Sequence, residues 1–302
     1  MAAGTDWVAV DWGTSNVRAW GIAADGSQTF SARSDKGMGK ISRADYPGVL
    51  ESLVGAETKG PVDVVICGMA GARQGWIEAP YFETPARLGH LAARAVTPAG
   101  AGERFSPRIL PGVCQRATGS EDVMRGEETQ ILGLLRLRPG FEGTAILPGT
   151  HSKWIEISDG RITRFQSAMT GELYEVLSQH SVLRHSFASE QAGPETDAGT
   201  VAGMQAGLDH PELVTSLAFR TRAASLLSGK GADWCSGYLS GLLIGAEIGG
   251  HRDWLGTAVV PLIGSARLCR TYASVLQTIG IESLSIDATD ATLAGLKEAR
   301  AQ

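Results

Sequence analysis

The same run of three short strands and a helix occurs twice in this chain, and this repeat restricts the fold more than any other feature. The first copy covers residues 7–54 and the second covers residues 144–183. In each copy a Gly-Thr turn follows the first strand, and an Asp-Gly turn, which is typical of hairpins, follows the second. The turns are Gly13-Thr14 and Asp25-Gly26 in the first copy, and Gly149-Thr150 and Asp159-Gly160 in the second. The Gly-Thr turns are 136 residues apart and the Asp-Gly turns 134, so the second copy is two residues shorter.

Further strands and helices follow each copy, so the sequence predicts an α/β fold built from two similar halves. After the first copy we expect a buried strand at 62–67 and helices at 86–95 and 121–137. After the second we expect helices at 197–208, 212–227 and 238–248, a strand-turn-helix at 257–279, and a last strand and helix at 283–286 and 289–301. A doubly wound dinucleotide fold is excluded because neither half opens with β-α-β and a GxGxxG turn. A GxxxxGK[ST] phosphate loop is absent from the sequence as well.

The length and charge of the chain narrow the classes of protein that it can belong to. Its 302 residues suit one or two domains, and we divide them into residues 1–141 and 142–302. The formal net charge of −5 excludes a chain-wide basic surface, so no nucleic-acid partner is expected. No apolar run approaches the ~18 residues of a membrane span, and no signal peptide is recognisable. The four cysteines are far apart, which indicates buried thiols. We therefore expect a cytoplasmic protein without membrane partners, and the sequence leaves a homo-oligomer open.

The turn after the first strand carries groups that suit an anion. Gly13 allows backbone N–H groups to approach a phosphate, and Thr14 and Ser15 add short donors. Asp11 ends an apolar strand, where a charge needs a partner, and a metal ion bound through water would be one. The alternative is a capped hairpin in which Asp11 only bonds to the turn.

Two later turns carry similar chemistry. Gly149, Thr150 and His151 form the equivalent turn of the second copy, with a lysine shortly after them. Two such turns facing one cleft would hold a polyphosphate from both sides. The pair Gly264-Ser265 follows a buried strand and opens a helix, whose free N–H groups suit a nucleotide. Each turn taken alone is equally well explained as a structural connection.

Acidic residues precede the helix expected at 121–137, and a glycine-rich loop lies at 67–76. A carboxylate at the edge of a cleft can take a proton from a hydroxyl group, and we favour Glu127 for this role, with Asp122 as the alternative. The helix dipole alone would also favour acids at this position. In the glycine-rich loop Arg73 could bind a carboxylate, and Gln74 and Trp76 could shape a small polar pocket. The loop could equally be an exposed connection.

Five segments in this order carry a resemblance to a known family. They are DWGTSNVRAW at 11–20, CGMAGARQGW at 67–76, DVMRGEETQILG at 122–133, LPGTHSKW at 147–154 and PLIGSARL at 261–268. They resemble the 2-dehydro-3-deoxygalactonokinases, a branch of the actin/hexokinase/Hsp70-like superfamily. The resemblance implies two ribonuclease H-like domains of the actin-like ATPase and hexokinase type. Each would follow the order βββαβαβα, with a cleft between them. It also implies ATP-dependent phosphorylation of the 6-hydroxyl of 2-dehydro-3-deoxy-D-galactonate.

The resemblance assigns roles to the residues singled out above. Asp11 would contact Mg²⁺ through water. Related sugar kinases have a catalytic aspartate at the start of the helix that closes the first domain, and Glu127 is the acid nearest to that position in this sequence. The nucleotide would be held by Gly13, Thr14 and Ser15 in the first phosphate loop, Gly149, Thr150 and His151 in the second, and Gly264 and Ser265 at the adenosine. A 2-keto acid also needs a cation for its carboxylate. For that we choose Arg73 first and Lys36 second.

Other functions on the same fold remain alternatives. One is a kinase of another sugar or sugar acid, and the sequence does not distinguish the galacto from the gluco epimer. A second is a phosphohydrolase or chaperone-like ATPase, although no residues remain for a peptide-binding module after two nucleotide-binding domains. A third is a non-catalytic sugar-acid sensor, but no helix-turn-helix segment precedes Trp7.

Overall fold

The computed structural model describes residues 4–100, 102–187 and 195–302. The chain divides into two compact units, each described here by itself. Unit 1 comprises Met1–Glu142, Ile157–Phe165 and Ala288–Gln302, and unit 2 comprises Gly143–Glu156 and Gln166–Asp287. The division at residues 141 and 142 stays our proposal for the domains. Within the described residues, no helix combines the length and the apolar character needed to cross a membrane.

The main sheet of unit 1 has five strands in the order β3-β2-β1-β4-β7. The strands are β1 (Trp7–Trp12), β2 (Val17–Ile22), β3 (Gln28–Ser34), β4 (Val62–Gly68) and β7 (Phe105–Ile109). β1 runs antiparallel to β2 and parallel to β4, and β4 runs parallel to β7. The apolar residues of β1 and β4 are almost entirely buried, as central strands of a covered sheet require.

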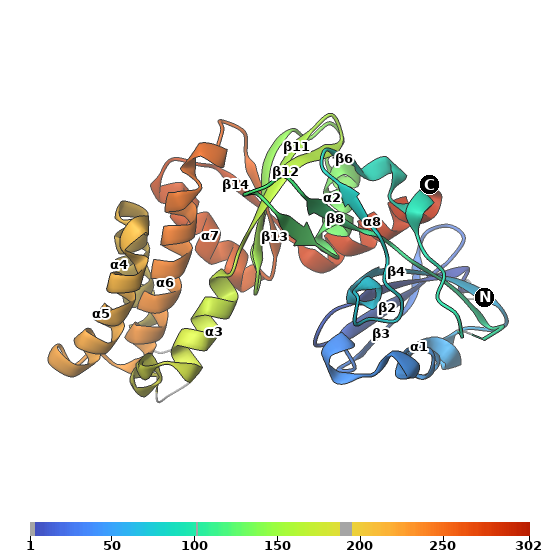
Figure 1. Cartoon of the computed structure of the whole chain (residues 1–302), viewed down its shortest axis with the longest axis horizontal. Helices are drawn as coiled ribbons and strands as arrows, with labels where there is room; N and C mark the ends of the chain where they lie inside the picture. Colours follow the sequence, from blue (N-terminus) through green and yellow to red (C-terminus); the bar gives the residue numbers. More distant parts are fainter. Residues whose placement is uncertain (1–3, 101, 188–194) are drawn as a thin grey trace. The chain divides into compact units, whose positions relative to one another are not determined.

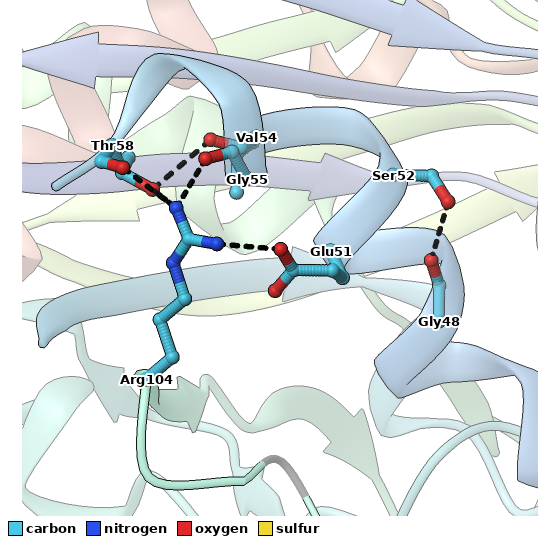
Figure 2. Close-up of polar contacts among 7 residues, drawn as sticks. All are labelled: Gly48, Glu51, Ser52, Val54, Gly55, Thr58 and Arg104. Carbon is cyan, nitrogen blue, oxygen red and sulfur yellow. Dashed lines mark hydrogen bonds and ion pairs between the residues drawn. The ribbon is translucent and has the colours of Figure 1, made fainter. Parts of the chain in front are cut away.

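Helix α1 (Tyr46–Val54) contributes to the core of unit 1. The rings of Trp12, Tyr46 and Trp76 pack together in that core, with centroids 4.6 to 6.3 Å apart. Figure 2 shows how the end of α1 is held by Arg104, which donates to the carbonyl oxygens of Gly55 and Thr58. The same guanidinium forms an ion pair with Glu51 at 2.6 Å (Figure 2). A cation at a helix C-terminus satisfies carbonyl groups that have no partner within the helix.

Helices α2 (Glu127–Leu137) and α8 (Ala288–Ala301) pack closely in unit 1. A Cβ atom on Gly133 would collide with Ala291, and one on Gly295 would collide with Thr129, so both glycines allow backbone to lie against backbone. A second sheet of unit 1 has the order β5-β8-β9. Its strands are β5 (Tyr81–Glu83), β8 (Gly112–Gln115) and β9 (Asp122–Met124).

The sheet of unit 2 repeats the plan of the first. Its strands are β10 (Gly143–Leu147), β11 (Ser152–Ser158), β12 (Arg161–Ala168), β13 (Val260–Gly264) and β14 (Ser283–Asp287). They lie in the order β12-β11-β10-β13-β14, which is again third, second, first, fourth and fifth along the chain. The predicted internal repeat is therefore confirmed. Residues 157–165, the tips of β11 and β12, are counted with unit 1, where β12 pairs with β6 (Ala86–Arg87).

Helices occupy the chain between the third and fourth strands of unit 2. They are α3 (Thr170–His180), α4 (Thr196–Asp209), α5 (Val214–Leu227) and α6 (Ala232–Gly250), which lie together in Figure 1. Glycines along α4 and α6 allow these two helices to approach backbone to backbone. Helix α7 (Ala266–Thr278) then joins β13 to β14. The predicted helices of this region are confirmed, with ends moved by a few residues.

Two predicted helices of unit 1 are wrong in part. Residues 86–95 form β6 and the 3₁₀ helices Leu88–His90 and Ala92–Arg94. Leu88 and Leu91 are both buried, and a spacing of three suits a 3₁₀ turn as well as an α-helix. Residues 121–137 contain strand β9 before helix α2, because Gly126 adopts a φ of +112° and separates the two.

Candidate active site

The first Gly-Thr hairpin joins β1 to β2 and is covered by the segment after β3. Gly13 N–H donates to the carbonyl of Asn16 at 2.8 Å, and Gly39 N–H donates to the carbonyl of Thr14 at 2.9 Å. A Cβ atom on Gly37 would collide with the backbone of Thr14, Ser15 and Asn16. The side chains of Thr14 and Ser15 remain exposed. The turn is thus fixed from behind by backbone contacts, and its hydroxyl groups face solvent.

Asp11 lies at the end of β1 and pairs with Arg18 on β2. Arg18 Nη2 donates to Asp11 Oδ2 at 2.6 Å, and Arg18 Nη1 donates to Thr289 Oγ1 at 2.9 Å. The other carboxylate oxygen of Asp11 is 3.9 Å from the thiol sulfur of Cys67. Burial and the nearby charges of Asp11 and Glu128 raise the pKa of Cys67 well above its usual range, so it stays a thiol.

Two glycines bring three chain segments together beside Asp11. Gly68 ends β4 with a φ of +86°, and a Cβ atom there would be 2.6 Å from the carbonyl oxygen of Trp12 and 3.5 Å from Asp11 Oδ1. Gly126 precedes α2 with a φ of +112°, and its Cβ position is 3.4 Å from Gly68 Cα. Only glycine tolerates both the conformation and the close approach at Gly68. The start of α2 therefore lies close to the end of β1.

The acids around Gly126 have different environments. Glu127 is the first residue of α2, is partly buried, and accepts the N–H of Arg125 at 3.0 Å. Glu128 is fully buried and accepts the N–H of Gly126 at 2.7 Å. Burial and the neighbouring charge of Glu127 raise the pKa of Glu128 to about 8, so its side chain keeps a proton at neutral pH. Asp122 lies on strand β9.

The glycine-rich loop starts at Gly68, within this cluster. Arg73 and Gln74 are exposed, and the recorded partner of the Arg73 side chain is Glu78 at 3.9 Å. Trp76 is 5% exposed and belongs to the aromatic core with Trp12. Arg43 holds the loop by donating to the carbonyls of Arg73 and Gly75.

Lys36 is exposed in the segment that covers the first hairpin. Its carbonyl accepts the indole N–H of Trp12 at 3.2 Å. The four predicted substrate contacts, which are Lys36, Arg73, Gln74 and Trp76, stay predictions.

The second Gly-Thr hairpin joins β10 to β11 in unit 2 and packs against the start of α3. The carbonyl of Thr150 accepts the N–H of Glu172 at 3.0 Å, and the ring nitrogen Nε2 of His151 bonds to the carboxylate of Glu172. A Cβ atom on Gly171 would be 2.7 Å from Thr150 Cα, so this glycine is also needed for contact with the turn. His151 is half exposed.

Gly264 and Ser265 lie next to the second hairpin. A Cβ atom on Gly264 would be 3.0 Å from the carbonyl oxygen of Pro148, which immediately precedes Gly149. Ser265 caps α7 by accepting the N–H of Leu268 at 3.4 Å. The structure thus brings two of the predicted nucleotide-binding turns together, at the carboxyl ends of the parallel strands β10 and β13. Ligands of α/β sheets bind at this edge.

Comparison with known proteins identifies the family. A family model described as 2-keto-3-deoxy-galactonokinase matches residues 11–299. A protein of Rhizobium meliloti (strain 1021) named as a probable 2-dehydro-3-deoxygalactonokinase is 39% identical over 97% of this chain and 96% of its own length. The 2-dehydro-3-deoxygalactonokinase of Escherichia coli (strain K12) is 31% identical over 96% of both chains. The chain belongs to the 2-keto-3-deoxy-galactonokinase family.

A solved structure agrees with this family. The crystal structure of a Sinorhizobium meliloti protein with the same enzyme name has a TM-score of 0.91, at 39% identity over 97% of both chains. The chain is therefore a carbohydrate kinase. The predicted fold class, ribonuclease H-like domains of the actin-like ATPase type, is confirmed by this likeness and by the two sheets of equal strand order.

The sequence pattern did not reveal some residues of the candidate site. The partner of Asp11, Arg18, could have been found from hairpin register, because pairing β1 with β2 across the turn places these two residues opposite each other. Glu128 directly follows Glu127, and its complete burial could not be read from a helical pattern. Gly37 gave no signal in the sequence.

Proposed function

We propose that this chain transfers the terminal phosphoryl group of ATP to the 6-hydroxyl of 2-dehydro-3-deoxy-D-galactonate, in the breakdown of galactonate. The observation that carries the proposal is the family match over residues 11–299, together with the packing against Gly68 of both Asp11 and Gly126, the residue before Glu127. We also propose a cytoplasmic location. ATP-dependent metabolism takes place there, and all four cysteines are free thiols.

The nucleotide would be bound by backbone N–H groups and short hydroxyl groups. In unit 2 the second hairpin offers Gly149, Thr150 and His151 to phosphate, and Gly264 and Ser265 would lie at the adenosine. In unit 1 the first hairpin offers Gly13, Thr14 and Ser15. Phosphoryl transfer depends mainly on positioning and on neutralising charge, which rigid turns with outward donors can supply.

Mg²⁺ fits the donors near the first hairpin only as an ion held mainly by phosphate and water. Within the residues described, no group of three or more His, Cys, Asp or Glu side chains could hold a metal. Asp11 pairs with Arg18 through Oδ2, and its Oδ1, which the Cys67 thiol approaches at 3.9 Å, would accept a hydrogen bond from a water ligand. Mg²⁺ typically keeps several waters and uses few protein ligands when bound with nucleotide phosphates. When bound, it would neutralise charge on the phosphates, and Asp11 would hold it through water.

Glu127 is our choice for the base that accepts the proton of the 6-hydroxyl. It starts α2 beside the Gly68–Gly126 contact and is partly exposed, so a substrate hydroxyl can reach it. Glu128 is a poor alternative because it is buried and protonated at neutral pH. Asp122 remains the second candidate.

The carboxylate of the sugar acid would bind Arg73, with Lys36 as the second choice, and Gln74 would add a polar contact. Arg73 and Gln74 stand on a loop that begins at Gly68 and is anchored by Arg43, which would keep the loop near Glu127. Trp76 would support the loop from the core rather than touch the sugar acid, given its burial.

A coupled assay of ADP formation tests the proposal. The purified chain would be supplied with MgATP and, separately, with 2-dehydro-3-deoxy-D-galactonate, its gluco epimer, gluconate, glucose and no acceptor. We expect turnover with the galactonate derivative and a 6-phosphorylated product by ³¹P NMR. Phosphate release without an acceptor would indicate an ATPase. Turnover with glucose or gluconate but not with the galactonate derivative would refute the substrate assignment.

A further inference from the structure

A buried carboxylate in unit 2 has no role in the reaction described above. Glu247, on α6, is 7% exposed and accepts hydrogen bonds from three other elements. Trp154 Nε1 of β11 donates to Oε1 at 2.7 Å. The hydroxyl of Tyr272 on α7 donates to Oε2 at 2.8 Å, and the hydroxyl of Thr170, the first residue of α3, donates to the same oxygen. Burying an acid is costly unless its hydrogen bonds are made. These three donors offset that cost for Glu247.

Two of these donors, Tyr272 and Thr170, connect Glu247 to the second hairpin. The Tyr272 hydroxyl is also 2.9 Å from Ser152 Oγ, and Ser152 follows His151. Burial, and after it the charge of Glu247, raise the pKa of Tyr272 well above its usual range. Tyr272 therefore stays protonated and donates a hydrogen bond to Glu247, and the Ser152 hydroxyl in turn donates to Tyr272.

The other donor fixes the opposite side of the turn. Thr170 is followed by Gly171, which packs on Thr150, and by Glu172, whose N–H bonds to the Thr150 carbonyl. Glu247 thus holds the end of the hairpin through Tyr272 and Ser152, and its centre through Thr170 and the start of α3.

We propose that Glu247 is a positioning residue for nucleotide binding, which sets the second hairpin in the conformation that accepts the phosphates of ATP. The proposal rests on the proposed function of that hairpin. The Glu247 side chain bonds to Trp154, Thr170 and Tyr272 rather than to the turn itself, so it would act on the turn through the two hydroxyl groups. The hydroxyl groups of Thr170 and Tyr272 must both point at Oε2 of Glu247. This requirement fixes the positions of α3 and α7 relative to β11.

Two variants that each remove one of these hydroxyl groups test this. Tyr272→Phe removes the connection to Ser152, and Thr170→Val removes the connection to α3, while both keep the buried volume. We expect each to raise the KM for ATP about threefold to tenfold and to leave the KM for the sugar acid unchanged. The matched control is Tyr238→Phe, which removes a buried hydroxyl of α6 that bonds to Leu217 and not toward the hairpin. This control should keep the wild-type KM for ATP.

Variants at position 247 provide a second measurement. Glu247→Gln can still join Trp154 and both hydroxyl groups through its amide, so it should bind ATP more tightly than Glu247→Met, which offers no acceptor. If Glu247→Met does not fold, the two hydroxyl variants decide the question.

Thr150→Ala separates this inference from the proposed function. An unchanged KM for ATP in Thr150→Ala would overturn the phosphate role of the hairpin itself. If Thr150→Ala raises that KM while Tyr272→Phe and Thr170→Val match Tyr238→Phe, the positioning role of Glu247 is overturned and the proposed function stands.

Discussion

The two Gly-Thr hairpins stand at equivalent places in two sheets of the same strand order, yet their surroundings differ. Beside the first, Asp11 ends the strand and the acids of α2 approach through Gly68 and Gly126. Leu147 stands two residues before Gly149, where Asp11 stands before Gly13, and it is 4% exposed. The repeat therefore supplies two similar turns, and the side chains around each turn determine what it can do.

This difference assigns separate tasks to the two units. Unit 1 has carboxylates at its hairpin, which suit proton transfer and metal binding. In unit 2 Glu172, an acid that bonds to the hairpin, is engaged with His151, and Glu247 is buried behind the turn. The apolar Leu147 takes the position that Asp11 holds in unit 1, so the N–H and hydroxyl donors of the second hairpin lack that carboxylate, which suits an anion better. We infer that unit 1 carries the chemistry and unit 2 the greater part of nucleotide binding.

The largest effect is expected from Glu127→Gln. Without a carboxylate to accept the proton, kcat should fall by about 10²-fold or more. The KM for ATP should change little, because the nucleotide contacts proposed in unit 2 are intact. Steady-state kinetics measure both. Asp122→Asn is the comparison variant, and near-normal turnover of Glu127→Gln with a large loss in Asp122→Asn would transfer the role to Asp122.

Asp11→Asn should have the next largest effect. A metal held through water loses about 10- to 100-fold in affinity when its outer partner is removed, so half-maximal activity should need correspondingly more Mg²⁺. The measurement is a Mg²⁺ titration of the rate. Asp63→Asn is the matched control. Asp63 lies on β4 of the same sheet, opposite Trp7 at the start of β1, and pairs with Arg300 of α8 at 2.8 Å. A Mg²⁺ response equal to wild type in Asp11→Asn would reject its assignment.

Thr14→Ala and Thr150→Ala compare the hairpins directly. Loss of one hydroxyl donor to phosphate should raise the KM for ATP about fivefold to tenfold in each variant. A larger effect at Thr150 would support the division between the units. If only one variant differs from wild type, the other hairpin is merely a structural turn.

The smallest effect on activity, but a clear effect on stability, is expected from Glu128→Gln. The folded pKa of about 8 lies above the ordinary 4.5. Protonated Glu128 therefore contributes stability below pH 4.5 that is lost as pH rises toward 8. The loss is at most about 1.4 kcal/mol per pH unit. Denaturant unfolding at pH 5, 7 and 9 should show wild type losing stability relative to Glu128→Gln. Parallel pH profiles would contradict the protonated state.

The parts of the fold that could be predicted are those specified by neighbouring residues. Gly13-Thr14 and Asp25-Gly26 define turns within a few residues, and the same turns at 149 and 159 reveal the repeat. The helix expected at 86–95 failed because Ala86 and Arg87 pair with a strand distant in sequence. The helix expected at 121–137 begins only at Glu127, because the pattern did not reveal the backbone conformation of Gly126.

The candidate site could be predicted where a motif carries its own chemistry, as at Asp11 and Thr150. Glu247 gave no such signal, because its role depends on Trp154, Thr170 and Tyr272, which are far apart in the sequence. Arg18 lies between these cases, since the hairpin register determines its position opposite Asp11.

Calorimetric binding of a non-hydrolysable ATP analogue is the most direct test of the division between the units. Glu127→Gln should bind the analogue within about twofold of wild type, and Thr150→Ala should bind it about tenfold more weakly. Weak binding by Glu127→Gln together with wild-type binding by Thr150→Ala would contradict the assignment of chemistry to unit 1 and nucleotide binding to unit 2.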